Sequence, residues 1–514
     1  MKTKYFVLLG LIVATLSILT WFGCQNMGGG DKIHIALVGP LTNPTGESLI
    51  NGVNLYLEKI NKEGGVNGKT IILDTFDDQN DSGKAREIAL KIAEQKHAVA
   101  VIGHNWSSCS ISAGEIYKKN GVPAISPIST NVEVTKDNEW YFRTIFDDNL
   151  QGRFLANYAK QILRKNTASI IFEEDRPYGN NLAKIFEESA NEIGLTVKYK
   201  WGFKSKSKDV KENLKTIVDE LLPQKEDAGI IFLATHAVDG ITIVQLMKDT
   251  DISNDIIVPD AFGNKRFSDG FNTYPKEIEN PGFYTNGIYV TTPMLYDTAN
   301  QMAQQFKEQY TQKYLKVPDR YAPFAYDAAM LILEAVKKTD VQGTQSTIKE
   351  DRKKIRDYLA NLTKIDDAVK GLTGLNYFND NGDCRKPISI GVFRSKSIIS
   401  ALGQLRPVQY MNLIPDIEEA VNQKQIILFD KNYMYKTNVV YTGIEVKSIE
   451  NFNIEESTCT LDFYIWFRFQ GDLDADNIEF LNALENIELP APIEDEAKEM
   501  EAKEQEPAAE EPPA

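Results

Sequence analysis

The sequence is poor in cysteine, in histidine and in positive charge. It contains four cysteines and four histidines in 514 residues, and its acidic residues outnumber the basic ones to give a net charge of −16. Neither a Cys-x-x-Cys pair nor a clustered His/Cys spacing is present, so we expect no bound metal and no other cofactor. The net charge argues against nucleic acid as the main partner, because the phosphate backbone of nucleic acid requires a basic surface.

Recurrent catalytic motifs are missing as well. The sequence has no Gly-x-Ser-x-Gly elbow, no phosphate-binding loop, and no nucleophile and base at motif spacing. These absences argue against an enzyme. At 514 residues the chain is too long for one ordinary core, so two or three domains are expected.

The N-terminus has the features of a bacterial lipoprotein signal. Two lysines precede an apolar run over residues 5–22, and Gly23-Cys24 follows directly. This pattern predicts a signal peptide over residues 1–24 and lipidation of Cys24. An uncleaved anchor is the alternative, because the apolar run is nearly long enough to cross a bilayer. Both predict an exported protein held at the cell envelope, in the periplasm or on the outer face of the membrane, with residues 25–31 as a flexible tether.

Residues 32–405 alternate between short apolar runs and amphipathic stretches. We predict strands at 33–38, 70–74, 98–102, 168–172, 196–201, 229–233, 256–258 and 287–290, and helices at 51–60, 85–95, 110–119, 150–163, 181–193, 210–222, 298–314 and 325–338. Strands and helices that alternate at this spacing indicate parallel βαβ units. The pattern restarts near residue 150, and the strand at 287–290 with the two helices after it is expected to return to the first lobe. We therefore predict an α/β fold of two doubly wound, Rossmann-like lobes. They would form a hinged flytrap with its ligand beyond the carboxyl ends of the strands.

After residue 406 the pattern is that of an antiparallel sheet. Apolar and polar side chains alternate over residues 460–469, which is typical of a half-buried strand, and residues 439–449 predict its neighbour. We expect a small appended β module over residues 406–490. The acidic, Pro/Ala/Glu-rich residues 491–514 are predicted to be disordered, because they cannot bury enough apolar surface to offset their ordering entropy.

One long segment carries a family resemblance. The segment starting at Val101 reads VIGHNWSSCS and continues to GVPAISPIST, which ends at Thr130; the segments GGVNG at 64–68 and YAPFAYDA at 321–328 support it. From about Lys32 to Leu405 the chain resembles the leucine/isoleucine/valine-binding proteins of bacterial ABC importers, a type I periplasmic binding family. The resemblance implies that the two lobes close on a small ligand, with an amino acid as the expected class. It also implies that the protein delivers this ligand to an ABC permease.

The same strand ends predict a site for a carboxylate. A strand that ends at Gly103 leads into a helix beginning between Ser107 and Ser110, and a helix N-terminus offers unpaired N–H groups and a positive dipole end. A second strand end delivers Thr130 beside it. Taken singly, Ser107 and Thr130 also suit a cap or a turn. The resemblance implies that both bind the α-carboxylate of the ligand.

The other candidate site residues follow from the resemblance. Asp260 is implied as the partner of the ligand's ammonium group, with the carbonyl of Ile128 as a second acceptor. Tyr178 matches a tyrosine that helps to close the lobes, and His236 stands where the leucine-type binders have a tyrosine. The alternatives are a surface turn for Asp260, a packed loop for Tyr178 and a structural role for His236.

Some positions depart from the family. Asn105 and Trp106 replace residues that flank the site in the leucine-type binders, which leaves the side chain of the ligand open. Trp106 and Asn80 also stand where those binders have the cysteines of a disulfide. With Cys24 lipidated, three cysteines remain, and an odd number excludes a fully paired disulfide framework.

The C-terminal module leaves a second function open. Residues 439–481 resemble the first strands of the extracellular domain of bacterial pentameric ligand-gated channels, whereas a plain extension packed on the flytrap is the alternative. A signalling module would make the protein a ligand-sensing receptor that relays closure to a membrane partner. The sequence does not choose between transport and signalling.

Overall fold

The computed structural model describes residues 32–484 except 409–410, 412–413, 430–431 and 471–477. The predicted signal peptide with Cys24, the tether and the acidic tail lie outside the described residues. Two compact units make up the chain, the first ending at Thr437 and the second beginning at Asn438. No helix among the described residues is long and apolar enough to cross a membrane.

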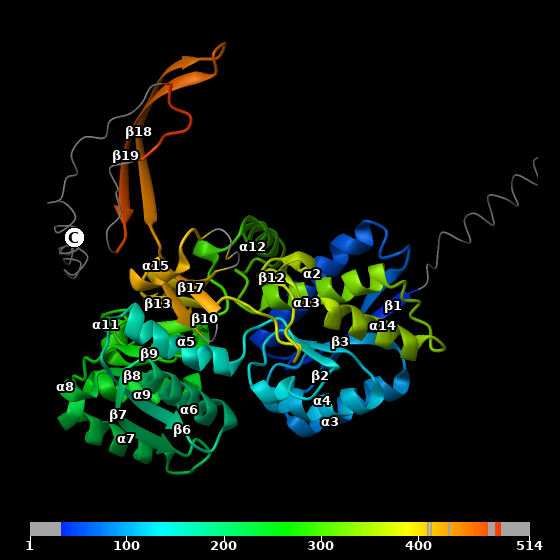
Figure 1. The fold of residues 1–514 in the computed structure, drawn as a ribbon, viewed down its shortest axis with the longest axis horizontal. Coiled ribbons are helices and arrows are strands. Elements are labelled where there is room, and N and C mark those ends of the chain that lie inside the picture. Colours follow the sequence, from blue (N-terminus) through cyan, green and yellow to red (C-terminus); the bar gives the residue numbers. More distant parts are fainter. Residues whose placement is uncertain (1–31, 409–410, 412–413, 430–431, 471–477, 485–514) are drawn as a thin grey trace, which may run out of the picture. The chain divides into compact units, whose positions relative to one another are not determined.

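The first lobe is built on a parallel sheet of five strands in the order β2-β1-β3-β4-β5 (Figure 1). Its elements are β1 (Lys32–Gly39), α2 (Pro44–Lys62), β2 (Thr70–Asp77), α3 (Ser82–Gln95), β3 (Ala98–Ile102), α4 (Ser107–Asn120), β4 (Ala124–Ser126) and β5 (Tyr141–Arg143). The side chains of β1 alternate between two cores, with Ile35 and Leu37 in one and Ala36 and Val38 in the other. Both faces of the sheet are therefore covered, as a parallel sheet requires.

The second lobe is built on a sheet of seven strands in the order β14-β13-β10-β9-β8-β6-β7. Its strands are β6 (Thr167–Glu173), β7 (Thr196–Phe203), β8 (Ile230–Ala234), β9 (Ile256–Val258), β10 (Tyr289–Thr292), β13 (Ser389–Arg394) and β14 (Ser397–Ser400). The helices between them include α5 (Asp148–Gln161), α6 (Pro177–Glu192), α7 (Val210–Leu221) and α9 (Ala237–Asp249). The strands from β6 to β10 are parallel, and β13 and β14 are added antiparallel. The predicted α/β fold with two doubly wound lobes is confirmed.

The chain crosses between the lobes more than once, but one predicted crossing is wrong. The strand predicted at 287–290 was assigned to the first lobe, whereas β10 pairs with β9 and β13 in the second sheet. The two predicted helices do return: α13 (Ala322–Lys338) contributes to the core of the first lobe, and Phe306 and Tyr310 of α12 (Gln301–Tyr314) share a smaller core with Leu55 of α2. Helix α14 (Ile348–Asn361), which was not predicted, also joins the first-lobe core and lies beside its strands (Figure 1). Periodicity identifies a strand but not its partners, which explains the error.

Helix α2 begins earlier than the predicted start at residue 51. The side chain of Asn43 caps it by accepting a hydrogen bond from the Gly46 N–H at 3.0 Å, and Pro44 occupies the first turn. Proline suits this position because its missing N–H would be unpaired there in any case. The cap, and not the apolar periodicity, therefore determines where this helix starts.

Three short strands between Gly403 and Asn438 form a sheet that belongs to the first unit. Its order is β15-β17-β16, with β15 (Gly403–Pro407), β16 (Ile426–Phe429) and β17 (Asn432–Asn438). Ile427, Phe429 and Met434 join the core of the second lobe. The predicted start of the β module at residue 406 is earlier than this division of the chain.

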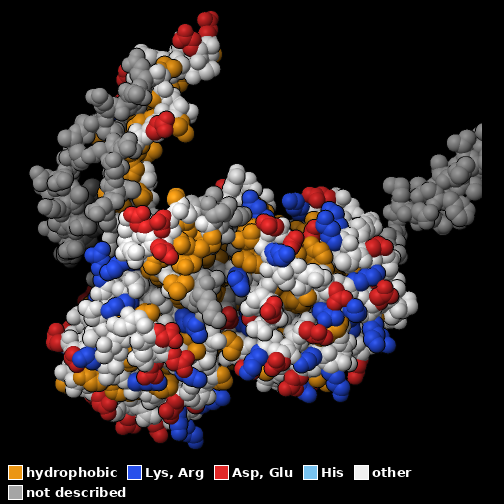
Figure 2. All heavy atoms as spheres, viewed as in Figure 1, with side chains coloured by type: hydrophobic (Ala, Val, Ile, Leu, Met, Phe, Trp, Pro, Cys, Tyr) orange, Lys and Arg blue, Asp and Glu red, His pale blue; other side chains and the backbone are white. Residues whose placement is uncertain are grey.

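The second unit contains an antiparallel hairpin of β18 (Tyr441–Asn453) and β19 (Thr458–Arg468). Cross-strand pairs such as Ile444 with Ile465 and Val446 with Phe463 place apolar side chains on one face, in the predicted alternation. Ile444 is 58% exposed, and Figure 2 shows apolar side chains along the hairpin. Phe463 on this face is in ring contact with Phe480, which follows the hairpin in the chain.

Candidate ligand-binding site

The carboxyl end of β3 leads directly to the N-terminus of α4. Gly103 follows the strand, and a Cβ at this position would lie only 2.2 Å from the Val38 carbonyl oxygen, so the close approach requires glycine. Helix α4 begins at Ser107 with Trp106 as its N-cap, and no side-chain hydrogen bond caps it. Ser107 is therefore the first helical residue and does not cap the helix. The uncapped end presents the positive dipole end that suits an anion.

The loop after β4 is ordered by serine hydroxyls. Ser126 Oγ accepts hydrogen bonds from the N–H groups of Ile128 at 3.3 Å and Ser129 at 2.9 Å. The hydroxyls of Ser129 and Ser110 lie 2.7 Å apart, which joins the loop to helix α4. Ile128, whose carbonyl was predicted to face the ligand, is buried in this loop.

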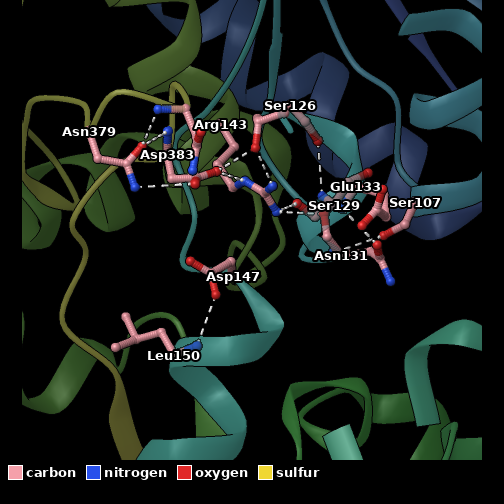
Figure 3. A network of polar contacts seen from close by, with 12 residues as sticks. Ser107, Ser126, Ser129, Asn131, Glu133, Arg143, Asp147, Leu150, Asn379 and Asp383 are labelled. Atoms are coloured by element: carbon pink, nitrogen blue, oxygen red, sulfur yellow. Dashed lines mark hydrogen bonds and ion pairs between the residues drawn. The ribbon is translucent and has the colours of Figure 1, made fainter. Parts of the chain in front are cut away.

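Arg143 holds the two residues that flank Thr130 (Figure 3). Its guanidinium Nη1 donates to the carbonyl oxygens of Ser129 at 3.2 Å and Asn131 at 3.0 Å. Its Nε is paired with Asp383 at 2.5 Å, and the arginine is fully buried. A charged donor that bridges two carbonyls fixes the backbone between them. Thr130 is therefore held in one position by its neighbours.

Ser107 lies beside the segment that carries Thr130, and Thr130 is connected to the second lobe. Ser107 Oγ accepts a hydrogen bond from the Asn131 N–H at 3.3 Å, next to Thr130 in the chain. The carbonyl oxygen of Thr130 accepts from the Asp148 N–H at 2.8 Å, at the first residue of α5. The hydroxyl pair predicted for a carboxylate thus adjoins an acidic residue that the sequence analysis missed.

Asp148 is a buried carboxyl group near Asp260, and the Thr130 hydroxyl favours its ionised form. It is fully buried, and neither of its carboxyl oxygens has a hydrogen-bond partner among the described residues. Burial, and after it the negative charge of Asp260, raise the pKa of Asp148 from 3.8 to about 8. The group is therefore mostly protonated at neutral pH. A cation placed beside it would favour its ionised form.

Asp260 lies at the end of β9 and is held by residues from two helices. Its Oδ1 accepts from the Tyr178 hydroxyl at 2.7 Å and from Gln151 Nε2 at 3.1 Å, while its own N–H donates to Gln151 Oε1 at 2.7 Å. Asp260 is only 4% exposed, so the surface-turn alternative is wrong. Tyr178 and Asp260, predicted separately, are in direct contact. Their roles as ligand contacts stay predictions.

His236 lies beside Tyr178, and its ring is hydrogen-bonded to the carboxyl group of Glu173. It is the N-cap residue of α9, and its ring centroid lies 4.8 Å from that of Tyr178. Its Nδ1 lies 2.8 Å from Glu173 Oε2. Although burial opposes ionisation of Glu173, hydrogen bonds from His236 and the charge of its ring hold the pKa of that carboxyl below its usual value. Glu173 thus fixes the orientation of a ring whose side chain is 39% exposed.

Arg320 brings a positive charge to the buried acids. It lies just before α13, and its Nη2 donates to the Asp260 carbonyl oxygen and to the Tyr321 hydroxyl. Its Nε and Nη1 are buried and have no hydrogen-bond partner among the described residues. The guanidinium therefore connects the start of the first-lobe helix α13 to Asp260 in the second lobe. Its Nε and Nη1 remain available as donors, since no described residue accepts from them.

Comparison with known proteins assigns the chain to a family. Residues 32–392 match the family model described as periplasmic binding protein. The chain belongs to the periplasmic binding protein family. The match ends before the hairpin of β18 and β19.

Curated relatives of this periplasmic binding protein include two from Pseudomonas aeruginosa. It is 33% identical to an amino acid binding protein over 187 residues, which cover 36% of this chain and 50% of that protein. It is 28% identical to a leucine-, isoleucine-, valine-, threonine- and alanine-binding protein over 245 residues, which cover 46% of this chain and 63% of that protein. The alignments thus span less than two thirds of either relative.

Solved structures show the same fold. An ABC transporter substrate-binding protein from Desulfitobacterium hafniense in complex with Leu has a TM-score of 0.60 at 24% identity, covering 72% of this chain and 100% of that one. A leucine binding protein, LivK, from Thermotoga maritima has a TM-score of 0.61 at 22% identity, covering 72% of this chain and 97% of that one.

The fold of this periplasmic binding protein gathers all six predicted contacts near the junction of its lobes. Ser107, Ile128 and Thr130 lie on the first lobe, whereas Tyr178, His236 and Asp260 lie on the second. The analysis of the sequence missed Asp148, Gln151 and Arg320. Asp147 is the N-cap of α5 and Asp148 its first residue, so the pair reads as an ordinary helix start. Among the described residues Cys109, Cys384 and Cys459 are free thiols.

Proposed function

We propose that this protein binds an α-amino acid between its two lobes and delivers it to an ABC importer, without catalysing a reaction. The observation that best supports this proposal is that groups suited to a carboxylate and groups suited to an ammonium ion lie within one network of contacts. The N-terminus of α4 with Ser107 and Thr130 suits a carboxylate, and the buried acids Asp148 and Asp260 suit an ammonium group. An α-amino acid carries both groups on one carbon. The names of the curated relatives agree with this class of ligand.

The unpartnered polar atoms support a polar ligand. A buried polar group without a hydrogen bond costs about 1–3 kcal/mol, so native structures contain few of them. The carboxyl oxygens of Asp148 and the Nε and Nη1 of Arg320 are such atoms among the described residues. The ammonium group of the ligand would supply a partner to Asp148. Trp106, which is 47% exposed at the start of α4, is available to contact the side chain of the ligand.

A thermal-shift screen of the purified protein tests this function. A ligand that binds only the folded state stabilises it by about 2.7 kcal/mol at a concentration of one hundred times its Kd. We expect at least one α-amino acid to raise the melting temperature in a concentration-dependent manner. A rise with carboxylic acids that lack an amino group, and none with any amino acid, would reject the proposed ligand class.

Alanine substitution of Ser107 or Thr130 should weaken binding of the amino acid found in that screen. Each hydroxyl that donates to the carboxylate contributes about 1–3 kcal/mol, so each variant should lose roughly five- to 150-fold in affinity by calorimetry. Ser108→Ala, at the next and exposed position of α4, is the matched control and should bind normally. The loss should vanish for an amine analogue without the carboxylate. Equal losses for both ligands would assign these hydroxyls to the structure of the loop.

The location at the cell envelope is part of the proposal. We propose that Cys24 carries the lipid anchor, although it lies outside the described residues. The supporting observation is the small residue before this cysteine, directly after an apolar run. A tethered binding protein would stay close to its permease in the membrane.

A ligand-sensing receptor is the second candidate function. It is favoured by the exposed apolar face of the β18–β19 hairpin, which includes Ile444, Val446 and Leu461, each at least half exposed. Exposed apolar patches of this kind mark surfaces for protein partners. Deletion of residues 438–484 distinguishes the two functions. A transport component should still support uptake of the ligand without these residues, whereas a receptor should lose its signal.

A further inference from the structure

Two histidines and an aspartate meet at the edge of the first sheet opposite the candidate ligand site. His34 lies near the start of β1, Asp74 lies on β2, and His97 directly precedes β3. These strands are neighbours in the order β2-β1-β3. The candidate ligand site adjoins the other end of β3, beyond Gly103. The two groups of residues are therefore separated by the length of that strand.

The donor atoms of the three side chains lie at the spacing of metal ligands. His34 Nδ1 is 3.1 Å from Asp74 Oδ2, and His97 Nδ1 is 3.7 Å from the same oxygen. One donor atom from each residue lies within 4.8 Å of the other two. Ligands at about 2.0–2.2 Å from a tetrahedral Zn²⁺ are about 3.4 Å from one another. The observed separations bracket that value.

The three side chains differ in how firmly the fold holds them. His34 and Asp74 are held on paired strands, with side chains 14% and 28% exposed, whereas the side chain of His97 is 53% exposed. The two imidazole rings lie close together, with centroids 3.6 Å apart and planes tilted by 31°. The exposed ring of His97 has room in solvent to adjust its orientation toward a bound ion.

The local charge favours a cation. Helix α3 ends at Gln95, two residues before His97, and the C-terminal end of a helix carries a partial negative charge. The Asp74 carboxylate adds a full negative charge when ionised. Against this, Lys96 follows the helix and is exposed. The Asp74 carboxylate and the C-terminal end of α3 therefore both lie next to the two imidazoles.

We propose that His34, Asp74 and His97 bind one divalent transition-metal ion, with water completing a tetrahedral shell. Two imidazoles and one carboxylate suit Zn²⁺, whereas Mg²⁺ and Ca²⁺ prefer oxygen ligands throughout. In the absence of metal, an imidazole Nδ1 that faces Asp74 can donate a proton to it. On binding, this proton moves to Nε2 or is released, and the freed lone pair ligates the ion. The site is independent of the proposed amino-acid function.

Zinc titration of the chelator-treated protein tests the site. The protein should carry a purification tag free of histidine, and Zn²⁺ binding is measured by calorimetry and by the absorption of tetrahedral Co²⁺. We expect one ion per chain. His97→Ala and His34→Ala should each lower the affinity by more than about 100-fold, because even outer-shell substitutions cost about 10–100-fold. Zn²⁺ should also raise the melting temperature of the wild type and not that of His97→Ala.

Matched variants separate this site from other zinc-binding groups. Glu94→Gln removes an exposed carboxylate of α3 outside the cluster and should bind Zn²⁺ as the wild type does. His97 is exposed, so His97→Ala should fold even if His34→Ala does not. Failure of the wild type to saturate with Zn²⁺ would overturn the proposal. So would unchanged affinity in His97→Ala, or a loss of binding in His236→Ala with His97→Ala unaffected.

Discussion

Asp260→Asn should weaken binding of the α-amino acid by about 2–5 kcal/mol, which corresponds to a loss of roughly 30-fold to several thousand-fold in affinity. The substitution keeps an acceptor for the hydroxyl of Tyr178 but removes the negative charge that would pair with the ammonium group. Leaving a buried ammonium without its partner costs far more than losing an exposed ion pair. Calorimetry with the amino acid found in the thermal-shift screen measures the effect.

Controls distinguish a ligand contact from a structural acid. Asp219→Asn, at an exposed position of α7, should leave affinity unchanged. A carboxylic acid that lacks the amino group should bind Asp260→Asn as well as it binds the wild type. If the folded Asp260→Asn variant binds the amino acid normally, then Asp260 only supports Gln151 and Tyr178, and the assigned role is wrong.

Asp148 should make the ligand-free protein less stable as the pH rises. In the folded state burial and the charge of Asp260 raise the pKa of this carboxyl from 3.8 to about 8, so the folded protein holds a proton that the unfolded chain has released. Between about pH 4 and pH 8 this group lowers the free energy of unfolding by about 1.4 kcal/mol for each pH unit. Denaturant unfolding at several pH values measures the slope.

The isosteric variant Asp148→Asn isolates this contribution, because other buried carboxyls with raised pKa values, such as Asp319, also add to the slope. The wild type should lose stability relative to Asp148→Asn by about 1.4 kcal/mol for each pH unit up to about pH 8, and the difference should level off above it. Identical slopes in the two proteins would show that Asp148 is ionised in the folded state.

The same carboxyl couples ligand binding to proton release. An ammonium group placed beside Asp148 favours its ionised form, so binding of the amino acid near pH 7 should release up to one proton. Calorimetry in buffers with different ionisation enthalpies measures this number. Asp148→Asn should bind without that release, whereas release that persists in the variant would assign the proton to another group.

Local sequence signals predicted the elements of the fold well, because their causes are local. Strand β3 has the predicted bounds, since an uninterrupted apolar run ends at Gly103. Strands β6 and β8 are placed within a residue of their predicted limits. The start of α2 was missed because an Asn cap and a proline determine it, and the apolar stripe begins later. Polar helices such as α14 were overlooked because their few apolar positions give a weak periodic signal.

Two residues of the candidate site were accessible from local sequence signals in the same way. Ser107 and Thr130 follow strand ends, and the carboxyl ends of neighbouring parallel strands meet at one edge of a sheet. Asp148, Gln151 and Arg320 have no such signal. Their importance comes from burial, and for Asp148 and Arg320 also from polar atoms without a hydrogen bond. These properties depend on contacts between distant segments: Gln151 and Arg320 contact Asp260 across 109 and 60 residues.

The sequence by itself determined the alternation of strands and helices, the membership of a binding-protein family and the strand ends that carry Ser107 and Thr130. Each of these depends on residues close together in the chain or on a continuous motif. Only the tertiary structure decided that β10 joins the second sheet, that Asp148 is buried beside Asp260, and that His34, Asp74 and His97 meet on neighbouring strands. Spacing along a chain does not encode distance across a sheet, because strand order is set by the packing of the whole lobe.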